Sequence, residues 1–95
     1  MRLVYTAQAY RDLDAIWLYI AKDNRRAADR VIARIRQSAE MLADHPKLGR
    51  VWESGATRAL LVSGLPYRIP YRVSEDAATV EILTVWHTSR LPPVL

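Results

Sequence analysis

The side chains that could carry out chemistry lie in the last third of the chain. His87 and Arg90 follow an apolar segment, and Arg68 lies within the run Tyr67–Val73. A histidine can act as an acid or a base, and arginines can stabilise the charge of a phosphate. If the two segments are neighbouring strands, Arg68, His87 and Arg90 could converge on one patch. No partner base accompanies the histidine, so the set is incomplete as a nuclease site, and a structural or binding role for His87 is the simpler interpretation.

Arginines also recur at regular spacing. Arg68 and Arg72 would share one face of a strand, because side chains alternate between faces with a period of two. Arg26, Arg30 and Arg34 would form a stripe along a helix, where like charges repel by a few tenths of a kcal/mol per pair. A solvated face explains either set. An acidic partner would turn the same residues into a binding surface.

Composition narrows the class of protein. The chain has 95 residues and a net charge of +4, and twelve of its 14 basic residues are arginine. Arginine suits carboxylates and phosphates, so an acidic protein segment or a nucleic acid is the favoured partner, although a genome rich in G and C would give the same composition. The absence of cysteine excludes a disulfide framework and a thiol nucleophile. Two distant histidines do not suggest a zinc site, and we expect no metal and no cofactor.

The length fits one domain, residues 1–95. The first residues lack the apolar core of a signal peptide, and every apolar run is far shorter than the ~18 residues that a membrane span needs. We therefore expect a cytoplasmic protein without a membrane partner.

The hydrophobic pattern predicts a strand, two helices and three further strands. An apolar run at 2–5 ends at Thr6, a good N-cap, and helical periodicity then continues to about Asp23. Asn24 can cap a second helix that runs to about Asp44, which makes an antiparallel helical hairpin. The segment 45–50, with its proline and glycine, ends the helical region.

Short alternating runs predict the strands that follow, at 58–62, 67–73 and 79–86, joined by tight turns as an antiparallel meander. Pro70 lies inside the second of these runs, which indicates an edge strand or a bulge. The tail, residues 90–93, is expected to be extended. The predicted fold is α+β in the order β-α-α-β-β-β, with the helical hairpin packed on one face of an antiparallel sheet.

The first helix carries more apolar side chains than one buried stripe requires. Tyr10, Trp17, Leu18 and Tyr19 add to its core-facing residues and surround much of its circumference. The surplus indicates either deep burial or a groove for a partner, since aromatic residues are enriched at interfaces.

Taken together, the motifs of the chain resemble the RelE/ParE superfamily of type II toxin–antitoxin systems, and in particular its ParE branch. The resemblance covers about 85 of the 95 residues. It is carried by Ala9-x-x-Asp12-Leu13-x-x-Ile16-x-x-Tyr19-Ile20, Ala28-x-x-x-Ile32-x-x-Ile35, Leu42-x-x-x-Pro46-x-x-Gly49-Arg50, Thr57-Arg58-x-Leu60, Pro66-Tyr67-Arg68-Ile69-x-Tyr71-Arg72-Val73 and Ile82-Leu83-x-Val85-x-His87-x-x-Arg90.

The resemblance implies the same β-α-α-β-β-β fold and a toxin that a cognate ParD-like antitoxin neutralises with its acidic C-terminal segment. ParE-like toxins poison DNA gyrase without cutting nucleic acid. The RelE branch instead cuts mRNA at the ribosome with basic residues on its strands, but the strand positions that would carry lysines look like Ala59 and Leu61 here. We therefore expect a gyrase inhibitor. The alternative is a RelE-like ribosome-dependent endoribonuclease that uses Arg68, His87 and Arg90, and a third hypothesis is a relative that has lost its toxicity.

For antitoxin contact, side-chain chemistry selects a set of aromatic and cationic residues: Trp17, Arg30, Arg34, Arg58, Arg68 and Arg72. Whether the protein also binds nucleic acid directly is left open by its charge.

Overall fold

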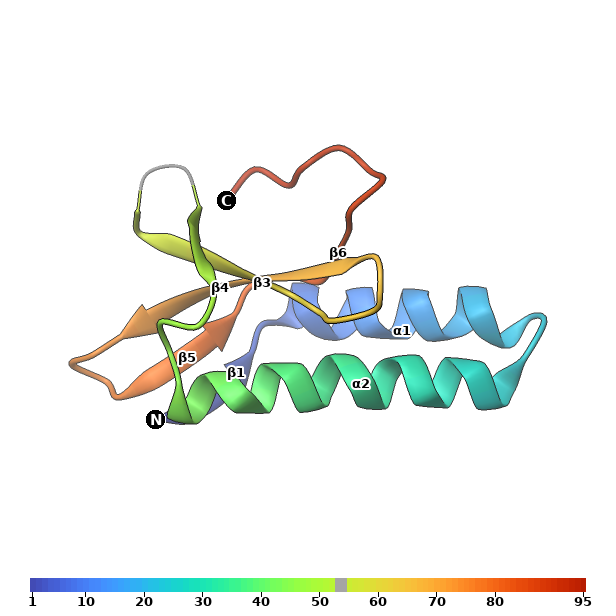
Figure 1. The fold of residues 1–95 in the computed structure, drawn as a ribbon, viewed down its shortest axis with the longest axis horizontal. Coiled ribbons are helices and arrows are strands. Elements are labelled where there is room, and N and C mark those ends of the chain that lie inside the picture. Colours follow the sequence, from blue (N-terminus) through green and yellow to red (C-terminus); the bar gives the residue numbers. More distant parts are fainter. Residues whose placement is uncertain (53–54) are drawn as a thin grey trace.

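A computed structural model describes residues 1–52 and 55–95 of the chain and shows two helices packed on one face of a sheet (Figure 1). The elements in chain order are β1 (Arg2–Tyr5), α1 (Ala7–Ala21), α2 (Arg25–Asp44), β2 (Arg50–Trp52), β3 (Thr57–Leu61), β4 (Tyr67–Ser74), β5 (Thr79–Ile82) and β6 (Trp86–His87). The predicted α+β class and the order of its main elements are confirmed. The short strand β2 was not predicted, and the expected strand 79–86 is divided into β5 and β6.

The strands are arranged in the order β1-β5-β4-β3-β2, and β6 pairs with β4 beyond the end of β5. Neighbouring strands from β2 to β5 are antiparallel, as predicted, but β1 lies parallel to β5. The sheet is therefore mixed rather than wholly antiparallel. A parallel pair needs a long connection, and the helical hairpin begins the long segment that joins these two strands.

Both helices begin at the predicted caps. The Thr6 side chain accepts a hydrogen bond from the Ala9 N–H at 3.0 Å, and Asn24 accepts one from the Ala27 N–H at 3.0 Å. Each cap satisfies a backbone donor that has no partner within its helix. The Thr6 hydroxyl also donates to the Leu83 carbonyl at 2.7 Å, which ties the start of α1 to the chain that follows β5.

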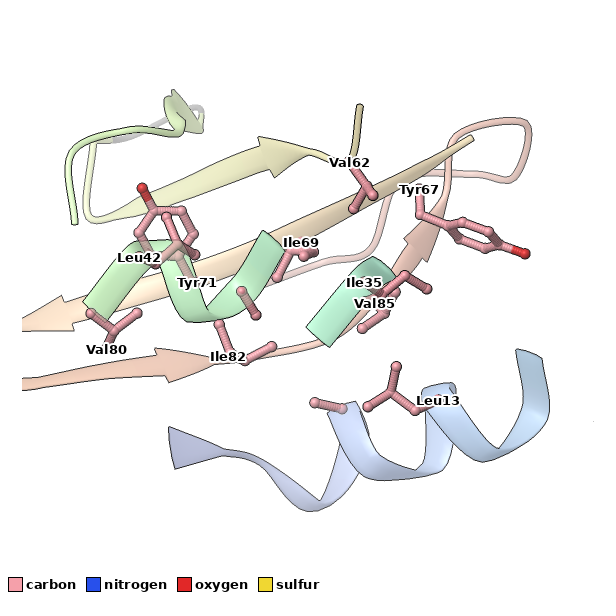
Figure 2. Packing of buried hydrophobic residues seen from close by; sticks show 12 residues of the cluster. Leu13, Ile35, Leu42, Val62, Tyr67, Ile69, Tyr71, Val80, Ile82 and Val85 are labelled. Carbon is pink, nitrogen blue, oxygen red and sulfur yellow. The ribbon is translucent and has the colours of Figure 1, made fainter. Parts of the chain in front are cut away.

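The core lies between the helical hairpin and the sheet (Figure 2). Its members are Leu13 of α1, Ile35 and Leu42 of α2, and a set of sheet residues that includes Ile69, Tyr71, Val80 and Ile82. The Tyr71 hydroxyl donates to the Pro46 carbonyl at 2.6 Å and accepts from the Gly49 N–H at 2.9 Å. This fully buried ring therefore fastens the loop after α2 to the centre of the sheet.

Pro70 lies opposite a β-bulge. The pairs on either side of it are Tyr71 with Ile82 and Arg68 with Trp86. Residues 69–70 of β4 therefore face three residues, 83–85, which is the one-residue excess that defines a bulge. The Pro70 carbonyl accepts from the Leu83 N–H at 3.0 Å, and because N–H and C=O of a strand residue point to the same side, its missing N–H faces the bulge. The predicted bulge is confirmed, but an edge position is wrong because β4 is central.

No helix within residues 1–52 and 55–95 is long and apolar enough to cross a membrane.

Candidate functional site

The residues proposed for chemistry are divided between the two faces of the sheet. Arg68 pairs with Trp86, and Tyr67 pairs with His87. Successive side chains of a strand point to opposite faces, so His87 lies on the helical face with Tyr67, whereas Arg68 lies on the face that the helices leave uncovered. The expected convergence of three residues is therefore not found. Only His87 and Arg90 remain together.

His87 and Arg90 line a cleft of about 520 Å³ between α1 and the C-terminal tail. The tail leaves β6 and then turns back toward the side of the molecule where β2 and β3 lie (Figure 1). The cleft residues come from α1, β4, the bulge between β5 and β6, β6 itself and the tail: Asp12, Ala15, Ile16, Tyr19, Ile20, Tyr67, Thr84, Val85, Trp86, His87, Ser89, Arg90, Leu91 and Pro93.

The His87 ring is oriented by the residues beside it. Its Nδ1 accepts from the Ser89 N–H at 3.2 Å and lies 2.7 Å from the Ser89 hydroxyl oxygen, within hydrogen-bond distance. The edge-to-face contact with Tyr67 brings the ring centroids to 5.2 Å. A backbone N–H can only donate, so Nδ1 is the acceptor in the contact with the Ser89 N–H.

Tyr67 and Arg90 interact electrostatically. Burial raises the pKa of the Tyr67 phenol above its ordinary value of 10.0, and the positive charge of Arg90 partly opposes that rise. The aromatic ring is buried, and its hydroxyl points away from the other core side chains (Figure 2). Tyr19, which also influences this pKa, is 71% exposed at the cleft. The positive charge of Arg90 thus acts on the phenol of Tyr67, and both residues line the same cleft.

Asp12 supports this cleft from α1. Its Oδ2 accepts from the Thr84 hydroxyl and from the Val85 N–H, the latter at 3.0 Å, and its Oδ1 accepts from Gln8 at 2.8 Å. The carboxylate therefore holds the bulge that leads into β6. Asp12 appeared in the sequence only as part of the family resemblance. Its position could have revealed this role. Asp12 is next to the buried Leu13 and three residues after the buried Ala9, so it lies near the core-facing side of α1. An acidic side chain is found at such a place only when hydrogen-bond or charge partners accompany it.

The uncovered face of the sheet carries a second, aromatic cluster. The Trp52 and Trp86 rings meet edge to face with centroids 5.4 Å apart, and the Arg68 guanidinium lies 5.9 Å from the Trp86 ring centroid. Two strands separate β2 from β6, so in a flat sheet their backbones would lie roughly 14 Å apart. The contact shows that the side chains close over the sheet, beside a hollow of about 460 Å³ whose lining includes Ala59 and Leu61. Trp52 was missed because β2 was not predicted.

Two of the residues selected for partner contact have internal roles. The Arg58 guanidinium donates to the Gly49 carbonyl at 2.9 Å, and the Trp17 indole donates to Asp29 at 2.8 Å. Both side chains are half-buried, so in the isolated chain they stabilise the loop after α2 and the helical hairpin.

The other selected arginines are exposed and do not form one patch. Arg30 and Arg34 lie on α2, where Arg34 donates to the Ser63 carbonyl at 2.8 Å. Arg72 lies on the uncovered face with Arg68, and its contact with Glu81, at 3.9 Å, is the single ion pair among residues 1–52 and 55–95. In the same part of the chain, no three His, Asp or Glu side chains gather as a metal site would require.

The model of the ParE toxin of the type II toxin–antitoxin system parDE matches residues 3–92. The chain belongs to the ParE toxin family. Two relatives support this assignment along nearly the whole chain. A protein of Sinorhizobium fredii that is named as a toxin, Y4kP, is 46% identical over 92 residues, which cover 97% of this chain and 93% of that protein. The toxin RelE2 of Caulobacter vibrioides is 37% identical over 90 residues, covering 95% and 98% of the two chains.

Solved structures of toxins share the fold of this ParE-family chain. A chain of the chromosomal ParDE system of P. aeruginosa superposes with a TM-score of 0.79 at 27% identity, covering 92% of this chain and 95% of that one. A chain of the RelBE2 toxin–antitoxin complex of Mycobacterium tuberculosis gives 0.68 at 26% identity, with 90% and 95% covered. The isolated RelE toxin of E. coli gives 0.65 at 12% identity, with 95% and 86% covered, which shows a common fold alone.

Proposed function

We propose that this type II toxin inhibits DNA gyrase in the cytoplasm and is neutralised by a cognate ParD-like antitoxin. The observation that carries the proposal is the division of Arg68 from His87 and Arg90 by the sheet. A ribonuclease must place its acid, its base and its phosphate-binding groups around one reacting phosphate, within hydrogen-bond reach. Residues on opposite faces of a sheet do not meet that requirement.

The state of His87 argues in the same direction. A general base must offer a lone pair to the substrate, but the Nδ1 of His87 already accepts from the Ser89 N–H and contacts the Ser89 hydroxyl. On the uncovered face, the neighbours of Arg68 at the positions expected to hold lysines in the RelE branch are Ala59 and Leu61, which bring no charge.

An acidic antitoxin segment fits the charge and the exposed apolar surface of the chain. The net charge is +4, and the exposed apolar side chains include Leu18 at 61% and Leu91 at 91%. Arg30, Arg34, Arg68 and Arg72 are exposed and can meet carboxylates. The family match and the ParDE and RelBE2 neighbours support a partner of this kind.

The test uses purified toxin, gyrase and relaxed plasmid. We expect loss of supercoiling, or accumulation of gyrase-cleaved DNA, in proportion to toxin, and recovery when the antitoxin encoded beside the toxin is added. Total RNA from cells that express the toxin should show no new cleavage at ribosome-bound transcripts.

The second candidate is the ribosome-dependent endoribonuclease. It is favoured by one observation, the exposed Arg68 beside Trp86 on a hollow face, because arginine and tryptophan are groups on which bases stack. Transcript cleavage that disappears in Arg68→Ala, without an effect on gyrase, would establish this function in place of the first.

A further inference from the structure

The turn that begins the C-terminal tail is fastened to β6 by three hydrogen bonds. The Arg90 N–H donates to the His87 carbonyl at 3.0 Å, and the Trp86 indole donates to the Arg90 carbonyl at 3.1 Å. The third bond, from the Ser89 N–H to Nδ1 at 3.2 Å, makes the His87 side chain itself a part of the turn. Together these bonds fix the direction in which the chain leaves the sheet.

Beyond the turn, the tail has few attachments. In the part of the chain that the structure describes, no hydrogen bond joins residues 91–95 to the rest of the molecule. Leu91 is 91% exposed, although it lines the cleft together with Pro93. The position of the cleft wall that the tail supplies therefore depends on the turn at residues 87–90.

The bond between Ser89 and the His87 ring exists only while Nδ1 is unprotonated. Histidine changes its charge between about pH 8 and pH 5, and the charged ring carries a proton on both nitrogens. The Ser89 hydroxyl, 2.7 Å from Nδ1, can then reverse its role and accept from the ring. The Ser89 N–H cannot reverse its role, because a backbone N–H only donates. Protonation of His87 therefore breaks the bond that the ring makes to the backbone of the turn.

The charged and titratable groups around the ring come from three elements. Tyr67 of β4 meets the ring edge to face, Asp12 and Tyr19 of α1 line the same cleft, and Arg90 follows in the tail. Asp12 is the only acid among the described residues that line the cleft, and its oxygens already accept hydrogen bonds. A charged His87 would place two positive charges in one turn of four residues, which weakens the turn further.

We propose that His87 is a pH-sensitive latch for the tail, which holds the turn at residues 87–90 while the ring is neutral and releases it when the ring is protonated. The Thr88 N–H keeps its bond to the Pro66 carbonyl, at 2.9 Å, so the change begins after Thr88 and leaves the sheet intact. In acid, the tail wall of the cleft is released from α1. The latch concerns this chain by itself and does not depend on the target of the toxin.

The experiment measures backbone order parameters of ¹⁵N-labelled toxin at about pH 8 and about pH 5, the range in which histidine titrates. The order parameters of Ser89, Arg90 and Leu91 should fall from roughly 0.8 to below about 0.6, while those of α1 and β4 stay constant. The amide signals of the turn should shift together with the ring signals of His87 in the same titration. Order parameters that are equal at both pH values would overturn the proposal.

Three variants separate the latch from a general effect of acid. His87→Gln supplies an amide oxygen that accepts but does not titrate, so the tail should stay ordered at both pH values. Ser89→Ala removes the hydroxyl that can accept from the charged ring, so the loss of order in acid should exceed that of the wild type. The matched control is His45→Gln, which removes the exposed histidine that follows α2 and should respond as the wild type does.

A thermal unfolding curve for each variant shows that the domain is folded before its tail is compared. If the tail of His87→Gln loosens in acid as much as that of the wild type, the latch is wrong. A response that disappears in His45→Gln would assign the pH dependence to the other histidine and would also refute the proposal.

Discussion

Replacing Asp12 by alanine tests whether one carboxylate holds the bulge between β5 and β6. The variant removes a charged acceptor from the Thr84 hydroxyl and from the Val85 N–H, whose residues are both buried. Hydrogen bonds to charged groups contribute about 1.5–3 kcal/mol, and a helical alanine returns roughly 0.5 kcal/mol. We expect a net loss of about 2 kcal/mol in the free energy of unfolding, which lowers the Tm of a domain of this size by roughly 8–16 °C.

The assay is urea unfolding followed by tryptophan fluorescence, with Asp14→Ala as the control. Asp14 is an exposed acid of the same helix, so its replacement should change stability by less than about 0.5 kcal/mol. In a double-mutant cycle with Thr84→Val, we expect a coupling of about 1 kcal/mol and faster hydrogen exchange at the Val85 N–H. If Asp12→Ala and Asp14→Ala are equally stable, or if the coupling is zero, the bulge does not depend on the carboxylate.

Two further predictions concern the loop after α2. A Cβ at Gly49 would lie 2.7 Å from Cε1 of Tyr71 and 2.8 Å from the backbone oxygen of Ala59, so Gly49→Ala should cost about 1–3 kcal/mol in urea unfolding; a cost near zero would contradict this close approach. Burial raises the pKa of the Tyr71 phenol in the folded protein above its ordinary value of 10.0. As the pH rises, the unfolded chain therefore loses this proton before the folded chain does. The contribution of Tyr71 to folding stability is complete below about pH 10 and is lost as the pH rises through the folded pKa. Tyr71→Phe should lower stability at pH 7 by roughly 1–3 kcal/mol and reduce its loss between pH 9 and 11, as measured by unfolding across that range; an unchanged pH profile would refute the assignment.

The helices could be predicted from the sequence because their signals are local. Thr6 and Asn24 are caps next to periodic apolar segments, and the structure begins both helices there. Strand β2 could not be predicted in this way, since a strand of three residues exists only through its pairing with β3. The parallel pairing of β1 with β5 likewise depends on residues far apart in the chain, and no local pattern records it.

The candidate site was predicted in part, and a single residue of register explains the error. His87 and Arg90 were expected near each other and do line one cleft. Arg68 was expected to join them, but it pairs with Trp86 and not with His87, so it points to the other face. Pro70 indicated a bulge, but that local signal does not say how many residues lie opposite Pro70, and this number sets the register between Arg68 and Trp86.

The register that separates Arg68 from His87 therefore also decides which face of the sheet each side chain occupies. The bulge turns His87 toward the helical face, where Ser89 takes its accepting nitrogen and Arg90 lies beside it. The same bulge is held by Asp12 of α1, so the helix that lines one side of the cleft also fixes the chain that lines the other. A surface whose two walls depend on one half-buried carboxylate, that of Asp12, is organised before a partner arrives, which lowers the entropic cost of binding. Such preorganisation favours binding over a cleft whose walls must form as the partner arrives.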